Sequence, residues 1–229
     1  MTPVIGLKKQ GTSVKETDFF VPFIAQPQKA PHERTYFDND LIHILCIGKY
    51  EQRKHHLMLL KSVERLHEKY PLHLTLIGEA TTNFQKEYHE KVQAYVKEHH
   101  MERFVTVKTN VPRKEMDAEY TTADIYVIPS TREMASVSQL EAMSYSLPVI
   151  CSDANGTACY VEDGITGYLF EDCNQTDLQE KLDKLLSDRE RICKMGAAGY
   201  RALAEKYNFD NSFDTVMQMR DKILQEHLY

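Results

Sequence analysis

From residue 41 onward, the sequence alternates between short apolar runs and charged stretches that favour helix. The apolar runs are nearly continuous, as expected for strands that helices cover on both faces of a parallel sheet. Each charged stretch between two runs therefore predicts the helix of a right-handed βαβ unit. The expected strands are 41–48, 72–78, 103–109, 124–130, 148–152 and 167–170, and the expected crossover helices include 54–69, 82–100 and 113–122.

This pattern predicts one doubly wound α/β domain, with a Rossmann-like and mainly parallel sheet of six strands, over residues 41–208. From about residue 175 the sequence is helical to its end, with a break at 209–210 before a last helix in 209–229. Four prolines in residues 1–40 predict an irregular strap or linker there. In folds of this kind, ligands bind at the carboxyl ends of the strands.

Composition limits the function classes. The chain has 28 Lys and Arg against 34 Asp and Glu, a net charge of −6, which argues against nucleic-acid binding through an overall basic field. Cys46 and Cys151 lie inside apolar runs, and the five cysteines include no C-x-x-C pair, so we expect reduced, buried thiols in a cytosolic protein. Any anion site must therefore come from a local group of cations.

Such a group follows the first expected strand. Gly48 permits a sharp exit turn, and Lys49, Arg53 and Lys54 come within the next six residues. We call these three cations the basic cluster. At the carboxyl edge of a parallel sheet, the basic cluster predicts a site for a diphosphate, whose charge it can neutralise without a metal ion.

Adjacent histidines at 55–56 and 99–100 raise the question of a metal site. Neighbouring residues of a helix point in different directions, so neither pair can direct both rings at one ion. We therefore expect surface histidines and no metal, with His55 near enough to the basic cluster to reach a phosphate.

Two glutamates bracket the start of the helix expected after the fourth strand. Glu133 lies in the loop, and Glu141 lies five residues into the helix, roughly 7–8 Å along its axis from the cap. Ser136 and Gln139 fit a capping box, in which each side chain bonds to the backbone of the other residue. The first-turn amides attract a phosphate or sugar oxygens. A sugar nucleotide, with hydroxyls at both ends and an anion between them, suits this arrangement.

These segments resemble the carboxyl-terminal, donor-binding half of a retaining GT-B glycosyltransferase of the family-four or group 1 type. The resemblance runs from about residue 41 to 190, and it rests on Gly48-Lys49-x4-Lys54, "AEYTTADIYVIPS", "EMASVSQLEAM", "LPVICSD" and "VEDGITGYLF". It implies transfer of a hexose-type sugar from a nucleotide diphosphate sugar, such as a UDP-sugar, to a glycan or glycoconjugate acceptor in polysaccharide biosynthesis. It also implies that neither a metal nor another cofactor is needed.

The resemblance further implies roles for single residues. Glu133 would bind hydroxyls of the donor sugar and Glu141 the ribose hydroxyls, while Lys49 and Lys54 would hold the diphosphate. Val111 aligns with a position that contacts the base through its backbone. The candidate catalytic residues are Glu133, Lys49 and Lys54, and the candidate donor-binding residues are Gly48, Lys49, Arg53, Lys54, Val111, Glu133, Ala135, Ser136, Val137 and Glu141.

The sequence also departs from the family pattern. Lys49 replaces the more usual arginine, which exchanges a two-pronged donor for a point charge. Ala135-Ser136 stands where Phe-Gly is common. Ser146 replaces a frequent glycine, and Cys159 a frequent glutamate. None of these changes removes the basic cluster or the paired glutamates, but they leave the identity of the donor open.

GT-B enzymes have two Rossmann-like domains, and this chain has room only for the donor-binding one. The resemblance implies either a segment cut from a larger enzyme or a chain that works with a separate partner bearing the acceptor domain. Residues 209–229 would then pack toward the missing amino-terminal domain. The run "FFVPFIA" (19–25) is either a strap over the core or a surface that met that domain.

Two other functions stay open. Sugar-nucleotide epimerases share the GT-B architecture, and a non-catalytic sugar-nucleotide-binding or scaffolding subunit would keep the same residues. The basic cluster, the two glutamates and the ending "GTACYVEDGITGYLF" favour transfer over epimerisation. We expect a cytoplasmic protein. Docking of the full-length enzyme at the inner face of the membrane is left open, because relatives with lipid acceptors dock through the other half.

Overall fold

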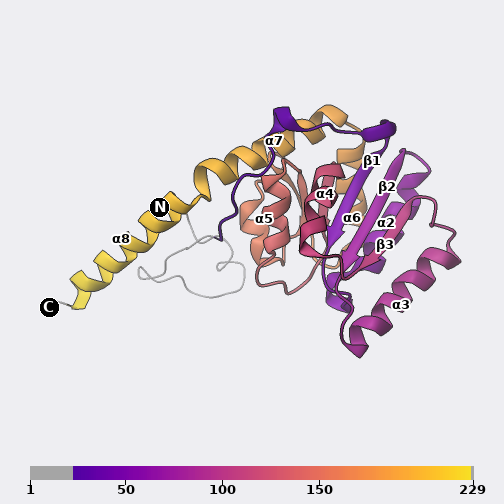
Figure 1. Ribbon diagram of the computed structural model, residues 1–229, viewed down its shortest axis with the longest axis horizontal. Helices are drawn as coiled ribbons and strands as arrows, with labels where there is room; N and C mark the ends of the chain where they lie inside the picture. Colours follow the sequence, from indigo (N-terminus) through magenta and orange to yellow (C-terminus); the bar gives the residue numbers. More distant parts are fainter. Residues whose placement is uncertain (1–22, 228–229) are drawn as a thin grey trace.

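The computed structural model describes residues 23–227, so most of the 19–25 run lies outside the described residues. Six strands form one sheet in the order β3-β2-β1-β4-β5-β6, and every neighbouring pair is parallel (Figure 1). The predicted doubly wound α/β domain is thus confirmed. The strands are β1 Ile42–Ile47, β2 Leu72–Gly78, β3 Val105–Thr109, β4 Ile125–Ile128, β5 Val149–Ser152 and β6 Gly167–Phe170.

The helices follow the predicted pattern with small shifts at their ends. They are α2 His56–His67, α3 Asn83–Glu98, α4 Met116–Thr122, α5 Val137–Ser144, α6 Gln175–Leu186, α7 Arg189–Lys206 and α8 Phe209–His227. The break predicted at 209–210 comes earlier, because the Asn208 side chain accepts a hydrogen bond from the Asn211 amide (2.9 Å) and so begins α8.

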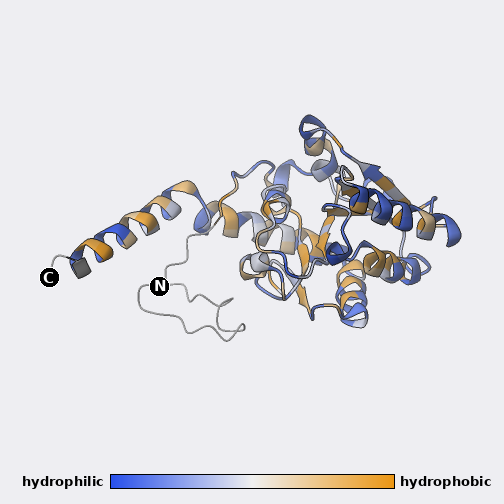
Figure 2. Cartoon of the chain, turned by 90° about the horizontal axis from the view of Figure 1, so that it is seen from below, coloured by the Kyte–Doolittle hydropathy of each residue, from blue (hydrophilic) through white to orange (hydrophobic). Residues whose placement is uncertain are grey.

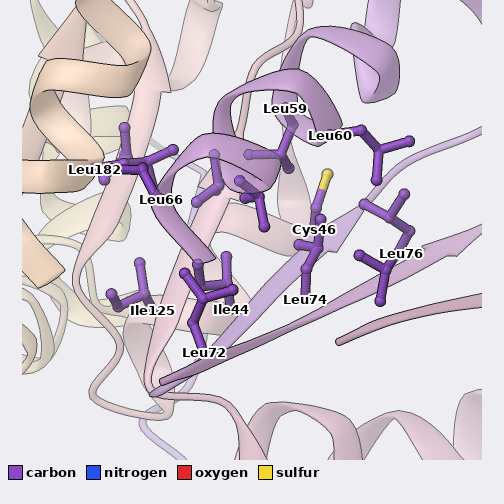
Figure 3. Packing of buried hydrophobic residues seen from close by; sticks show 14 of the residues in the cluster. Ile44, Cys46, Leu59, Leu60, Leu66, Leu72, Leu74, Leu76, Ile125 and Leu182 are labelled. Atoms are coloured by element: carbon purple, nitrogen blue, oxygen red, sulfur yellow. The ribbon is translucent and has the colours of Figure 1, made fainter. Parts of the chain in front are cut away.

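Both faces of the sheet are buried, which explains the near-continuous apolar runs. Side chains of a strand alternate between the two faces. Ile44 and Cys46 of β1 pack under Leu59 and Leu60 of α2 (Figure 3), whereas Leu45 joins the separate core that α4, α5 and α7 cover. Cys46 is buried and free, as predicted.

The order of the strands reverses between β1 and β4. β1 pairs with β2 on one side and with β4 on the other, so consecutive crossovers run in opposite directions from this point. The loops that follow β1 and β4 leave the same edge of the sheet next to each other. In doubly wound sheets a crevice for ligands forms at such a reversal.

Residues 23–40, which we call the strap, have no strand and run across the ends of α4 and α5. The Arg34 guanidinium donates to the carbonyls of Tyr120 and Ala123 near the end of α4, and to that of Tyr145 at the end of α5. A cation is favourable there, because helix carboxyl ends carry partial negative charge. Arg34 therefore fixes the two helices that bear Tyr120 and Glu141.

Helix α8 extends away from the sheet and its covering helices (Figure 1). Hydrophobic and hydrophilic residues are both distributed along it (Figure 2), and its exposed apolar side chains are Phe209, Phe213, Val216, Ile223 and Leu224. Packing of α8 toward another domain stays a prediction. Between residues 23 and 227, no helix combines the length and the apolar character needed to cross a bilayer.

Candidate functional site

The loops after β1 and β4 meet through a cluster of charges. The Glu133 carboxylate accepts hydrogen bonds through Oε2 from Lys54 Nζ and from Arg53 Nη1, the latter at 2.8 Å. The Thr131 amide also donates to the Arg53 carbonyl at 2.9 Å, which joins the two loops through their backbones. The structure thus brings together Arg53, Lys54 and Glu133, which the sequence placed on two segments about 80 residues apart.

Lys54 is only 8% exposed, an unusual position for a cation. Its stem lies against Gly48, where an added Cβ would meet Lys54 Cδ at 3.3 Å. Partial burial acts to raise the pKa of Glu133, but the hydrogen bonds and charges of Lys54 and Arg53 outweigh burial and hold that pKa below its usual value. Glu133 is therefore a carboxylate at neutral pH, and its two cations offset the cost of burying it.

Lys49, the third member of the basic cluster, has a different partner. Its side chain is 51% exposed and pairs with Glu79, with Nζ and Oε2 3.4 Å apart. Glu79 belongs to the loop after β2, so Lys49 is at the same edge of the sheet but does not contact Glu133. A weak, exposed pair of this kind leaves Lys49 free to turn toward a ligand.

Glu141 is held by residues that no sequence motif singled out. Its Oε1 pairs with Arg113 Nη1 at 2.6 Å, and its Oε2 accepts from the Tyr120 hydroxyl at 2.7 Å. Tyr120 is 2% exposed, and its ring stacks on that of Tyr145 with centroids 5.1 Å apart. Tyr120 was visible only inside the "AEYTTADIYVIPS" match, and Arg113 had no signal beyond its closeness to Val111.

The helix that carries Glu141 begins where predicted, but the predicted capping box is wrong. Ser136 is the residue that precedes α5, yet its side chain caps no amide. Gln139 is fully buried and binds Thr157, donating to its carbonyl (2.8 Å) and accepting from its hydroxyl (2.7 Å). The tertiary contact with Thr157 replaced the local one. The Gln139 amide donates to the Ser136 carbonyl at 3.2 Å, which leaves the first-turn amides of Val137 and Ser138 available to an anion.

The loop after β5 supports the backbone of Glu133. The Gly156 amide donates to the Glu133 carbonyl at 2.6 Å. A Cβ at position 156 would lie 2.0 Å from the Met134 carbonyl oxygen, so only glycine permits this contact. Asn155 forms the turn of this loop by accepting from the Thr157 amide at 3.0 Å. The orientation of Glu133 thus depends on the loops after β1, β4 and β5 together.

The remaining candidate residues surround this edge. Val137 is largely exposed at the start of α5, Ala135 precedes Ser136 in the loop, and half-buried Val111 follows β3 and packs against the core. A pocket of about 390 Å³ opens beside Glu141 and Arg113, between α4, α5 and strap residues 24–28.

The prediction of surface histidines is wrong for His56. Its ring is fully buried, with its centroid 5.0 Å from that of Tyr50, because α2 begins there and turns it inward. Burial lowers the pKa of His56 to about 3, so it is neutral. His55 is half-buried, with Nε2 3.5 Å from Cys173 Sγ. In the described part of the chain, no three His, Cys, Asp or Glu side chains are grouped to hold a metal ion.

The family model of the glycosyl transferases group 1 matches residues 28–202. D-inositol 3-phosphate glycosyltransferase from Pseudarthrobacter chlorophenolicus is 29% identical over 169 residues, which are 72% of this chain and 39% of that protein. The chain thus spans less than half the length of this curated relative.

Two solved structures show the same fold. The first is the C-terminal domain of a glycosyl transferase group 1 family protein, LpcC from Francisella tularensis, with a TM-score of 0.68 and 22% identity. That likeness covers 82% of this chain and 97% of the LpcC domain. The second is HepE from Anabaena in complex with UDP and glucose, with a TM-score of 0.67 and 14% identity over 80% of this chain and 48% of HepE.

Proposed function

The chain belongs to the glycosyl transferases group 1 family, and from this premise we propose that it is the donor-binding domain of a retaining, metal-independent glycosyltransferase. The enzyme transfers a hexose-type sugar from a nucleotide diphosphate sugar to a glycan or glycoconjugate acceptor, as in polysaccharide biosynthesis. A separate amino-terminal domain or partner chain supplies the acceptor site. This agrees with the match to D-inositol 3-phosphate glycosyltransferase, which covers 39% of that enzyme.

One observation carries this proposal: two cations and a carboxylate from the loops after β1 and β4 meet at the reversal of strand order. Lys54 and Arg53 are placed to bind a diphosphate, with the start of α5 beside them. A diphosphate that leaves a sugar gains negative charge, and fixed positive groups stabilise that charge. HepE, with the same fold, forms a complex with UDP and glucose.

The two glutamates divide the remaining recognition. Glu133, beside the cations, accepts from hydroxyls of the sugar, and Glu141, on α5, accepts from the ribose hydroxyls. Val111 contacts the base, and the backbone around Ser136 and Val137 contacts sugar and phosphate.

The chemistry requires no nucleophile from this chain. The bond between the anomeric carbon and the phosphate oxygen breaks while the acceptor oxygen attacks the same face of the sugar. The leaving phosphate takes the proton of the acceptor hydroxyl, so a nucleoside diphosphate and the glycoside are the products. Lys54 and Arg53 hold the diphosphate in place through both events.

Calorimetric titration of the 229-residue chain with UDP, GDP, ADP and their sugars tests the proposal. We expect weak but saturable binding of one of these nucleotides, unchanged when EDTA is present. If none binds at millimolar concentration, the assignment of a donor site is wrong. Turnover by the chain alone is expected to be slow, because the acceptor half is supplied from elsewhere.

A further inference from the structure

In the structure, Glu133 binds the same cations that the proposed function assigns to the diphosphate. One oxygen, Oε2, accepts from both Lys54 Nζ and Arg53 Nη1. The side chains of Lys54 and Glu133 are only 10% and 13% exposed, so little water competes with their pairing. Between residues 23 and 227, Glu133 Oε1 has no hydrogen-bond partner, so one oxygen of the carboxylate is unengaged.

An incoming diphosphate would meet this carboxylate as a competitor. Both are anions that seek the same donors, and like charges that share a site repel each other. Arg53 has an alternative partner, because its Nε binds Glu51 Oε2 at 2.8 Å and its side chain is 39% exposed. Lys54 carries three N–H donors on a flexible stem and is able to turn from Glu133 toward a phosphate. The cations are therefore able to change partners without a movement of the backbone.

We propose that Glu133 is a built-in counter-anion of Lys54 and Arg53, which the diphosphate of the donor displaces. Before the donor binds, Glu133 neutralises Lys54 and Arg53. When the diphosphate draws these cations away, the carboxylate is released to accept hydrogen bonds from the sugar. This inference rests on the proposed function and adds a coupling to it: the site recognises the sugar only after the diphosphate is bound.

The coupling predicts that one substitution, Glu133→Gln, strengthens the binding of pyrophosphate and weakens the recognition of the sugar. Glu133→Gln removes the competing charge but keeps the size of the side chain, so it should bind inorganic pyrophosphate about fivefold more tightly than the native chain. The same variant should lose the preference for a nucleotide sugar over its nucleoside diphosphate, because the amide is a weaker acceptor than the carboxylate. A residue that only stabilises the loop would weaken both ligands.

The experiment is calorimetric titration of the 229-residue chain with inorganic pyrophosphate at fixed pH and ionic strength. Four proteins are compared: the native chain, Glu133→Gln, Lys54→Met and Glu119→Gln. Glu119 pairs with Lys108 at 2.6 Å elsewhere in the domain, so Glu119→Gln makes the same change in net charge and is the matched control. We expect tighter binding by Glu133→Gln, loss of binding by Lys54→Met and no change for Glu119→Gln.

Equal or weaker pyrophosphate binding by Glu133→Gln overturns the inference, and so does the absence of pyrophosphate binding by the native chain. If Glu133→Gln does not fold, Glu133→Asp replaces it. The shorter carboxylate pairs less closely with Lys54 and should give an intermediate gain, whereas a loss contradicts the inference. Failure of the proposed function looks different, because then no UDP, GDP or ADP ligand binds the native chain.

Discussion

The two glutamates of the site lie on one short segment, yet different kinds of neighbour hold them. Glu133 is in a loop and binds two cations, one of them buried. Glu141 is on a helix and is oriented by the neutral, buried hydroxyl of Tyr120, with Arg113, whose side chain is 78% exposed, as its second partner. A charged ligand can therefore redistribute the partners of Glu133, whereas Tyr120 keeps Glu141 in position whatever charge the ligand carries.

The largest effect is expected from reversing the charge that holds Glu133. Lys54→Glu should weaken binding of nucleoside diphosphates by about 100-fold, because a charge-assisted contact to phosphate becomes a repulsion. Nucleosides without phosphate should bind as before, since Glu141 is unaffected. Calorimetry measures both ligands, and Lys91→Glu on the exposed face of α3 is the control. Equal losses for nucleosides and diphosphates would exclude Lys54 from the phosphate site.

The second effect tests whether Glu141 binds the ribose and Glu133 the sugar. Glu141→Ala should weaken nucleoside diphosphates and their sugars alike, by about tenfold, because the ribose loses a charged acceptor. Glu133→Ala should weaken only the sugar-bearing form. Each variant is titrated with a nucleoside diphosphate and with its sugar, and the affinity for each ligand is compared with that of the native chain. Glu115→Ala, at an exposed position, is the charge-matched control. If both variants lose affinity equally for both ligands, the roles have been divided wrongly.

A smaller effect is expected when the hydrogen bond from Tyr120 to Glu141 is removed. Tyr120→Phe removes one hydroxyl without changing the shape of the core, so nucleoside diphosphate binding should weaken about threefold and the free energy of unfolding should fall by about 1 kcal/mol. Tyr145→Phe, whose hydroxyl binds Asp117 instead, is the matched control and should leave affinity unchanged. Urea unfolding and calorimetry measure the two quantities. Affinity unchanged in Tyr120→Phe would show that Glu141 needs no orienting partner.

The smallest effect is on stability and depends on pH. The pKa of Glu133 is below its usual value in the folded chain, so its ionised form stabilises the fold at neutral pH. That contribution is present above the unfolded pKa and is lost as the pH falls through the lower, folded pKa. The difference in unfolding free energy between the native chain and Glu133→Gln, about 0.5 kcal/mol at pH 7, should therefore shrink as the pH falls below the unfolded pKa and vanish once the pH is below the lower, folded pKa. A difference that grows toward low pH contradicts this assignment.

The sequence predicted the sheet because burial of both faces leaves a strong local record. The run at residues 125–128 contains no charged side chain, and all four of its side chains are buried, as expected for a strand covered on both faces. The meeting of the loops after β1 and β4 also followed from the order of the elements, since both leave the carboxyl edge of the sheet.

Partner choice within the site could not be predicted in the same way. Gln139 had an available local partner in Ser136, but packing placed Thr157 within reach, and a buried amide takes the partner that satisfies it best. Lys49 and Arg113 are exposed, and their partners Glu79 and Glu141 come from other loops or helices. Such pairings depend on distances between segments that no sequence spacing records.

The central claim is that the edge where β1 and β4 end binds a nucleoside diphosphate. Amide chemical-shift mapping of the isotope-labelled chain, during titration with UDP, GDP and ADP, tests it most directly. We expect the largest shifts at residues 48–54 and 136–138, and no change in the shifts of amides near Lys194 on α7. Saturable shifts confined to α6 and α7, with residues 48–54 unchanged, would contradict it.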